Sequence, residues 1–369
     1  SFIFGGIASQ ACSIVARNRS LDDAVSTTKL SPQEAEDAKR DFYSDDLIRS
    51  YEGDLTAVNH VVAVTTALRD GGFTLTKFVS NVGAVETAIL SRLGREPPDR
   101  IVENSDRMHM ALGIPWSLDS DSLSIQIQLP DQPVDTKRGL LAVLMAVYDP
   151  LGWIVPFVLP LKLIMQRTYV GAGSCGWDEP LPSEIQSSSM RVIASLGHVR
   201  RLSFPRWYSA GIGTVAECQL HVLADGSSAA YGAAAYLRQV DEQGNIVCRL
   251  IMAKSRISPA EKTLSIPRAE LCGCAVAATL ADIIRRELEM KIDREFYWSD
   301  STAAIGYIKN VEKRFQVFVH NRCQLIRGLT DLQSWRHIDG RENPADYATR
   351  PMLLGESASI EKFAIWFSG

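Results

Sequence analysis

Four acidic residues in the second half of the chain stand at the ends of predicted secondary-structure elements. They are Asp225 and Asp300, each ending a strand-like run, Glu270 near the start of a long predicted helix, and Asp346 at the start of the last one. A carboxylate at the end of a buried strand is costly unless it is paired or binds a cation. Hard divalent cations such as Mg²⁺ prefer carboxylate oxygens and water, which these side chains supply. The four acids therefore predict one metal-binding cluster.

The order of the elements around these acids predicts how they meet. The expected strands are 219–224, 229–237, 246–254, 296–299 and 332–338, and the expected helices are 265–290, 301–308, 315–327 and one beginning at 343. Three antiparallel strands followed by α/β alternation are typical of an α/β fold with a mixed five-stranded sheet and flanking helices. In such a fold the four acids can converge.

Composition and charge limit the possible partners. With 369 residues and a hydrophobic share of 46%, the chain is long enough for two or three domains with ordinary cores. Its net charge of −4 and its pI near 5.9 exclude a strongly basic protein. Any nucleic-acid contact must therefore come from local basic patches.

The cysteines and the termini indicate the compartment. The seven cysteines are irregularly spaced, which argues against a disulfide framework and favours reduced thiols inside a cell. No run of about 18 apolar residues is present, so no membrane span is expected. The chain begins at Ser1 without a signal-peptide pattern, and we interpret it as a piece of a longer protein.

An acidic pair marks the first part of the chain. Asp45-Asp46 lies between apolar flanks, as in a hairpin that presents acids at its tip, and an alternating strand is expected at 73–79. A bare acidic pair is most often a polar turn. Here Tyr43-Ser44-Asp45-Asp46 resembles the Tyr-x-Asp-Asp motif of reverse transcriptases, and Phe4-Gly5-Gly6 resembles their template-contacting segment.

Two further segments extend this resemblance. Lys77 falls where the next palm strand would be, and 112–116 looks like the primer grip. The order and spacing are similar to the long-terminal-repeat retrotransposons of the BEL/Pao group. Reverse transcriptases need a third Asp upstream of the Phe-Gly segment, and this chain starts after that point. The resemblance therefore implies that Asp45 and Asp46 are remnants of a polymerase site that does not work in this chain alone.

The middle part carries the most specific motifs of this group. Thr136-Lys137-Arg138, Asp149-Pro150-Leu151-Gly152 and the Pro-rich turn 176–182 resemble the BEL/Pao connection region, part of what is called the Pao retrotransposon peptidase family. A strand pair is expected at 119–129, with helices at 139–147, 156–169 and 183–196. A retroviral-type aspartic peptidase needs Asp-Thr/Ser-Gly, which Asp225-Gly226-Ser227 does not match. We interpret this region as a connector between the flanking domains. Peptidase activity stays an alternative, although the residues here supply few groups for it.

The last part resembles the ribonuclease H domain of retroelements. The matching motifs are 223–227, 268–271, 298–301 and 343–350, and each contains one of the four acids. The resemblance implies hydrolysis of the RNA strand of RNA–DNA hybrids with two Mg²⁺ ions, or with Mn²⁺. Asp225 would bridge both ions, Glu270 and Asp300 would hold the ion near the leaving 3′ oxygen, and Asp346 would hold the ion at the attacking water. Without metal, the clustered carboxylates should have raised pKa values.

Substrate contacts are expected around the acids. Ser227 and Ser301 could contact phosphates or the 2′-OH of RNA, although turn and helix capping explains both equally well. The residues expected to contact the phosphate backbone are Lys254, Arg256, Arg268 and Asn321. Many cellular ribonucleases H carry a loop His before the fourth acid. Here Arg341 occupies that loop and His337 lies in a strand, which implies slow turnover unless Arg341 substitutes.

The domains expected from these patterns are 1–115 (palm remnant and primer grip), 116–215 (connection or thumb-like region), 216–352 (ribonuclease H-like domain) and a tail at 353–369. The expected partners are an RNA–DNA hybrid and the rest of a pol polyprotein, namely palm and fingers upstream and an integrase downstream. The expected location is the cytoplasm, in a virus-like particle, with the nucleus also open. The alternative to an enzyme is a catalytically idle, domesticated or degenerate protein that still binds nucleic acid. The oligomeric state is open.

Overall fold

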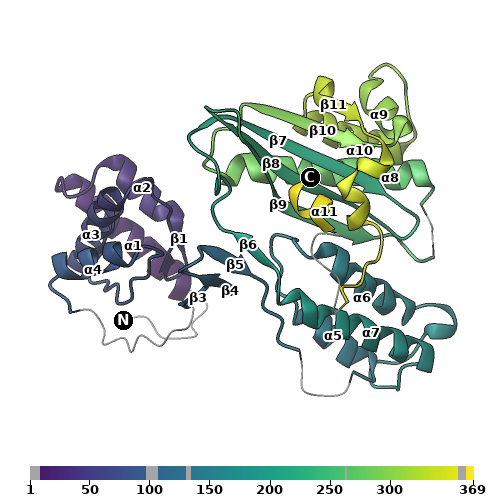
Figure 1. Cartoon of the computed structure of the whole chain (residues 1–369), viewed down its shortest axis with the longest axis horizontal. Helices are drawn as coiled ribbons and strands as arrows, with labels where there is room; N and C mark the ends of the chain where they lie inside the picture. Colours follow the sequence, from purple (N-terminus) through teal and green to yellow (C-terminus); the bar gives the residue numbers. More distant parts are fainter. Residues whose placement is uncertain (1–8, 97–106, 130–133, 262–263, 356–362) are drawn as a thin grey trace. The chain divides into compact units, whose positions relative to one another are not determined.

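The computed structural model describes residues 9–96, 107–129, 134–261, 264–355 and 363–369 (Figure 1). The chain divides into two compact units. One comprises Ser1–His109 with Ser117–Asp121, and the other comprises Met110–Trp116 with Ser122–Gly369. The finer division of the second unit at residue 215 stays a prediction. Among the described helices, none combines the length and apolar character that crossing a bilayer requires.

The first unit is mainly helical. Its helices are α1 (Ser9–Ser26), α2 (Pro32–Asp41), α3 (Asp54–Asp70) and α4 (Gly83–Arg92). A capping box starts α2, because the Ser31 hydroxyl accepts the Glu34 N–H while the Glu34 carboxylate accepts the Ser31 N–H. The strands β1 (Phe42–Tyr43) and β2 (Asp46–Leu47) pair as an antiparallel hairpin, as the acidic-pair motif predicts.

The strand expected at 73–79 is wrong. Residues 73–80 follow α3 without regular structure. Their alternation instead places Phe73 and Leu75 against the core of α1–α3, and Phe78 against that of α3 and α4. An alternating pattern becomes a strand only where a neighbouring strand is there to pair with it. Two short strands, β3 (Met108–Ala111) and β4 (Ile114–Ser117), follow further on.

Three helices precede the sheet of the second unit. They are α5 (Lys137–Met145), α6 (Val155–Arg167) and α7 (Ser183–Val199), with a 3₁₀ turn η1 (Gly171–Gly173). The strand pair expected over 119–129 lies a few residues earlier than predicted. Strands β4 and β5 (Ser122–Ser124) flank the turn at 118–121 and are neighbours in a four-stranded sheet of order β3-β4-β5-β6, where β6 is Ser203–Pro205. Beyond β5 the segment has only an isolated bridge between Ile127 and Val147. Ile125 and Ile127 are buried in the core that these helices build, so their apolar alternation serves helix packing.

The predicted mixed five-stranded sheet is confirmed. Its strands are β7 (Val215–Gly226), β8 (Ala230–Asp241), β9 (Ile246–Ile257), β10 (Arg294–Ser299) and β11 (Trp335–His337), in the order β11-β10-β7-β8-β9. The first three are antiparallel, and β10 runs parallel to both β7 and β11. The helices are α8 (Ile266–Glu287), α9 (Thr302–Lys309), α10 (Val317–Leu329) and α11 (Ala364–Ser368), with 3₁₀ turns η2 (Leu332–Ser334), η3 (Gly340–Glu342) and η4 (Pro344–Ala348).

The sheet has an apolar core on each face. Leu220 and Val222 of β7 face the core that contains α8 and α10, whereas Leu223 faces the core that contains α6 and α11. This is the alternation expected of a strand covered on both sides. In Figure 1, α11 lies in front of the sheet and α8 behind it. The Tyr236 hydroxyl donates to Trp366 O at 2.8 Å, so the described end of the chain packs on the sheet.

Helices α5, α6 and α7 pack into the same core as α11, on one face of the sheet. The backbone N–H of Ala253 on β9 donates to Leu151 O at 2.8 Å. A Cβ on Gly152 would lie 1.9 Å from Ala253 O, and its φ of +75° also favours glycine. The Asp149 carboxylate accepts the N–H groups of Trp153 and Ile154, each at 2.9 Å, and so fixes this turn. The motif 149–152 therefore joins the helices to the edge of the sheet.

The last helix, expected from 343, is only the 3₁₀ turn η4 of five residues. Pro351 explains its short length, because a residue before proline disfavours the helical region and proline donates no N–H.

A candidate metal centre at the ends of β7 and β10

Two glycines hold the end of β7 close to α8. A Cβ on Gly226 would lie 2.3 Å from the backbone of Ala269 and Glu270, and one on Gly273 would lie 2.3 Å from Asp225 O. Only glycine permits such an approach. The contact places Glu270 of α8 beside Asp225 at the end of β7.

Asp225, Glu270 and Asp300 form a compact carboxylate group. One oxygen from each lies within 4.8 Å of the others. Asp300 follows β10, whose Ser299 pairs in parallel register with Ala224 of β7, so Asp225 and Asp300 leave neighbouring strands at the same edge. Asp225 is 5% and Glu270 8% exposed. The structure therefore brings three of the four predicted acids together.

This environment disfavours ionised carboxylates. Burial, followed by the charges of Asp225 and Asp300, raises the pKa of Glu270 to about 8. The pKa of Asp300 is also raised, first by burial and then by Asp225. Glu270 Oε2 and Asp300 Oδ1 are buried without a hydrogen-bond partner among the described residues. Buried oxygens of this kind are costly, and a bound cation would relieve that cost.

Asp346 lies beside this group, on η4. Burial and the charge of Asp225 raise its pKa to about 6, while Arg350, whose Nε lies 2.6 Å from Asp346 Oδ1, opposes the shift. Asn343 Nδ2 donates to Ala224 O at 3.0 Å and ties this turn to β7. Asp346 is not one of the three acids whose oxygens converge within 4.8 Å.

Thr349 is the site residue that sequence reasoning missed. Its hydroxyl donates to the Asp225 carboxylate and lies 3.2 Å from Asp346 O. The side chain is 1% exposed, so this hydrogen bond is shielded from water. The sequence gives little indication of this role. Thr349 is simply the third residue after Asp346, and the motif 343–350 is identified by its acidic residue.

The donor set fits a hard divalent cation. The atoms that converge are all carboxylate oxygens, with no His or Cys in the group among the described residues. Mg²⁺ and Mn²⁺ prefer such ligands, whereas zinc sites normally include His or Cys. Two buried oxygens without partners leave coordination positions that the protein does not fill.

The two serines near the acids cap local structure. The Ser227 hydroxyl accepts the N–H groups of Ala229 and Ala230, at 3.2 and 3.1 Å. The Ser301 hydroxyl accepts the Ala304 N–H at 3.2 Å and caps α9. A role of either hydroxyl in substrate binding stays a prediction.

The predicted basic contacts come from three elements. Lys254 and Arg256 are exposed near the end of β9, and Asn321 is exposed on α10. Arg268, in the first turn of α8, lies over the ring of Phe318 at 5.2 Å. This contact links α8 to α10 beside Glu270. Phosphate binding by these side chains stays a prediction.

His337 and Arg341 differ in their relation to the acids. His337 ends β11, and its Nε2 lies 3.1 Å from Asp300 O. The exposed Arg341 lies in η3, where its Nε pairs with Asp339 Oδ1 at 3.2 Å. Arg341 thus contacts a neighbouring acid of its own turn.

The residues of the polymerase motif lie in the first unit, away in sequence from these acids. Tyr43, Asp45 and Asp46 are exposed on the β1–β2 hairpin, and Lys77 is exposed in the irregular segment after α3. Phe4-Gly5-Gly6 lies outside the described residues.

Several solved structures resemble the chain at low identity. Ribonuclease H1 from the halophilic archaeon Halobacterium salinarum is 15% identical, with a TM-score of 0.23, and the match covers 36% of this chain and 91% of that one. LC11-RNase H1 in complex with an RNA/DNA hybrid is 15% identical, with a TM-score of 0.24 and coverages of 34% and 88%. The foamy viral protease-reverse transcriptase in complex with double-stranded DNA is 15% identical, with a TM-score of 0.46 and coverages of 86% and 48%. The chain thus spans about half of that viral protein.

A family model gives the clearer result. Residues 136–301 match the model of the Pao retrotransposon-like RNaseH-like domain, a segment that contains Asp225, Glu270 and Asp300 and ends before Asp346. No curated protein is significantly similar to the chain. The resemblance to BEL/Pao retrotransposons is confirmed by this match, which runs from the N-cap of α5 to the residue before α9 and covers less than half of the chain.

Proposed function

We propose that the chain is part of a retroelement pol polyprotein whose second unit hydrolyses the RNA strand of RNA–DNA hybrids. The observation that carries this proposal is the carboxylate group of the buried Asp225 and Glu270 and the half-buried Asp300, with oxygens within 4.8 Å of one another. Burial and the neighbouring carboxylates raise the pKa of Glu270, so the fully ionised group is disfavoured unless a cation binds. Stability alone does not explain why a fold would keep carboxylates where their charged form is disfavoured, whereas cation binding does.

The proposed ligands are Asp225, Glu270 and Asp300, with Asp346 completing the set. Two divalent cations at such a site would neutralise the developing charge of the cleaved phosphodiester and activate a water. Asp225 is buried at the centre of the group, held by Thr349, and suits a ligand shared between two ions. Asp346 is more exposed and paired with Arg350, which suits the side facing the attacking water.

The first unit takes no part in the proposed RNA cleavage and bears only on the question of polymerase activity. Its hairpin carries Asp45 and Asp46, yet a two-metal polymerase needs a further carboxylate. We therefore assign RNA cleavage to this chain and leave DNA synthesis to a longer polyprotein.

Cleavage of a labelled RNA–DNA hybrid in Mg²⁺ tests the proposal. The chain should cut the RNA strand of the hybrid and leave single-stranded RNA and double-stranded DNA intact. Asp300→Asn should reduce the rate by at least about 100-fold, because it removes a charged ligand. The matched control is Asp282→Asn on α8, whose carboxylate pairs with Arg286 at 3.4 Å outside the acid group.

Equal rates for the wild type and Asp300→Asn would refute the nuclease assignment. Absence of cleavage with tight hybrid binding would favour the idle, nucleic-acid-binding alternative. Metal-independent self-processing that Asp225→Asn abolishes would favour the peptidase.

A further inference from the structure

Aromatic and basic side chains form a ladder across the sheet, on the face opposite α8. Its members come from four neighbouring strands: Gln219 and His221 of β7, Arg238 of β8, Phe296 and Trp298 of β10, and Arg336 of β11. Their positions alternate with Leu220, Tyr297 and Trp335, which face the core under α8. We call these six residues the aromatic ladder. None of them belongs to the acid group.

The rings of the ladder are in mutual contact. His221 stacks on Trp298, with ring centroids 6.0 Å apart and planes 8° apart, and lies 4.9 Å from Phe296. Trp298 Nε1 is 3.2 Å from His221 Nδ1. The Arg336 guanidinium lies over Phe296 at 4.6 Å and over Trp298 at 5.9 Å. Contacts of this kind hold the rings in fixed positions along the sheet.

The ladder is positively charged. Burial, followed by the charges of the nearby arginines, lowers the pKa of His221 to about 4, so the imidazole is neutral near pH 7. Arg238 donates to the uncharged Gln219 side chain at 3.3 Å, while the adjacent Arg294 is paired with Glu217. Among the described residues, no ion pair neutralises Arg238 or Arg336. The surface therefore combines flat rings with two guanidinium groups, of which Arg238 also feels the charge of Glu217.

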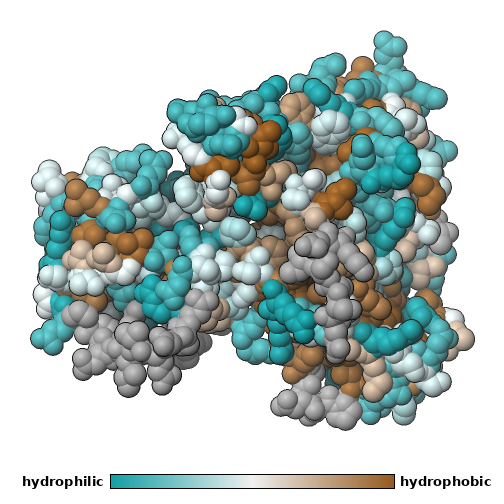
Figure 2. Space-filling model, in the orientation of Figure 1, coloured by the Kyte–Doolittle hydropathy of each residue, from teal (hydrophilic) through white to brown (hydrophobic). Residues whose placement is uncertain are grey.

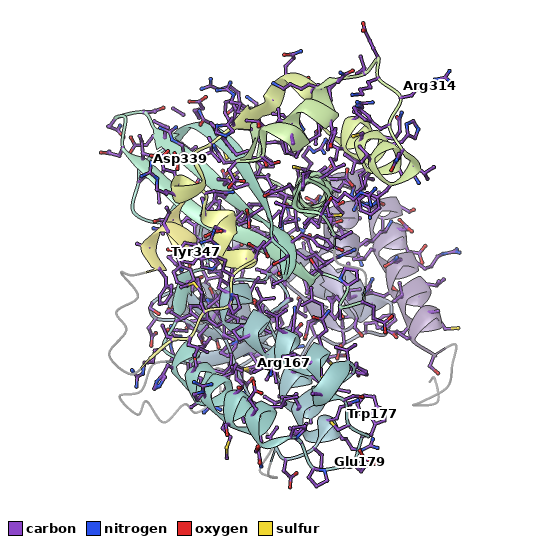
Figure 3. The ribbon with its side chains drawn as sticks, turned by 90° about the vertical axis from the view of Figure 1, so that its right-hand side faces the viewer. Arg167, Trp177, Glu179, Arg314, Asp339 and Tyr347 are labelled. Atoms are coloured by element: carbon purple, nitrogen blue, oxygen red, sulfur yellow. The ribbon has the colours of Figure 1, made fainter. Side chains whose placement is uncertain are left out.

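Part of this face is open. Trp298 packs at the margin of the core under α6 and α11, whereas Phe296 and His221 are half-buried and Arg336 is exposed. Figure 2 views the second unit from the side of α11 and shows apolar patches among hydrophilic residues. Figure 3 shows Asp339 and Tyr347 on one side of the sheet and helices α9 and α10 on the other. The ladder positions alternate with those that face α8 and α10, so the ladder lies on the other face of the sheet.

We propose that the aromatic ladder binds an unpaired nucleic-acid strand. Flat rings stack on bases only when the bases are unpaired, and arginines supply phosphate contacts and stack on bases as well. The neutral His221 suits base stacking better than a charged ring would. A duplex offers phosphates but no free base faces, so it fits the rings poorly.

The ladder lies on the strand that leads to the acid group. Phe296 is four residues before Asp300 on β10, which at 3.3 Å per residue is roughly 13 Å. A nucleic-acid strand bound here would therefore extend toward the acids. The ladder itself does not depend on the proposed cleavage, because none of its side chains is a proposed metal ligand.

Fluorescence anisotropy of the full chain with labelled oligothymidylate, in EDTA, tests this inference. A DNA single strand is not a ribonuclease H substrate, so failure of the nuclease assignment leaves this test intact. Phe296→Leu keeps an apolar side chain without the flat ring and should raise the Kd about tenfold. Arg336→Ala should weaken binding and lower the slope of log Kd against log salt by about 0.7.

Matched controls separate the ladder from general charge. Arg286→Ala removes an exposed charge from α8, on the opposite face, and should leave the Kd within about twofold. Asp300→Asn should bind at least as tightly as the wild type. Thermal unfolding checks that each variant folds. Wild-type affinity for folded Phe296→Leu, equal weakening by Arg286→Ala, or tighter binding of a duplex than of the single strand would each overturn the proposal.

Discussion

The Thr349 hydroxyl donates a hydrogen bond to the Asp225 carboxylate, although 124 positions separate the two residues in the sequence. The bond joins the segment after η4 to the central strand, because the same hydroxyl lies 3.2 Å from Asp346 O. Thr349 therefore orients one proposed ligand while bracing the turn that carries another.

Replacing Thr349 tests this orienting role. Thr349→Val keeps the shape and removes the donor, and a hydrogen bond to a charged group contributes about 1.5–3 kcal/mol. We expect metal affinity, measured by calorimetry, to fall at least tenfold. Thr349→Ser should restore most of it. If Val and Ser variants bind metal alike, the hydroxyl has no orienting role.

Neutralising Glu270 should separate stability from metal binding. Glu270→Gln replaces a carboxyl group whose ionised form is disfavoured by burial and two neighbouring carboxylates with a neutral amide, so the metal-free protein should unfold at a higher temperature near neutral pH. Mg²⁺ at about 100 times its Kd should stabilise the wild type by about 2.7 kcal/mol. The variant should lose most of that gain. Differential scanning calorimetry with Mg²⁺ and with EDTA measures both effects, and a variant that gains as much from Mg²⁺ as the wild type would contradict the assignment.

The metal-free protein should lose stability as the pH rises. Glu270 has a pKa raised from 4.5 to about 8, so between these values the folded state binds more protons than the unfolded state. Its contribution is therefore complete below pH 4.5 and is lost as the pH passes about 8. Denaturant unfolding in EDTA should show this decline in the wild type and a weaker one in Glu270→Gln. Parallel curves for both proteins would contradict it.

Gly273 should not tolerate a larger residue, because its backbone lies against that of Asp225. A Cβ at Gly273 would lie 2.3 Å from Asp225 O, so Gly273→Ala must separate α8 from β7. We expect a loss of roughly 1–3 kcal/mol in the free energy of unfolding, together with weaker metal binding. Gly306→Ala on α9 is the matched control, since nothing lies within 4 Å of its Cβ position. That variant should be neutral or stabilised by about 0.5–1 kcal/mol.

Local patterns were enough to predict the sheet and the convergence of three acids. Asp225 and Asp300 each end a strand, and Glu270 lies early in a helix, so topology alone brings them to one edge. Patterns failed where tertiary contacts decide. The alternating segment at 73–79 has no strand beside it, and Ile125 and Ile127 are buried by helices. Thr349 and Gly273 were missed because their roles depend on a partner far away in the sequence.

The contact between Leu151 and Ala253 gives the helices α5–α7 a protective role. Strand β9 is an edge of the sheet, and an edge strand left open can pair with other chains and aggregate. The Ala253 N–H is satisfied by Leu151 O, and the apolar face beneath is covered by α6. A shorter polypeptide beginning at residue 216 would expose both the edge and that face. A stable fragment that contains this sheet should therefore begin before α5, where the family match also begins.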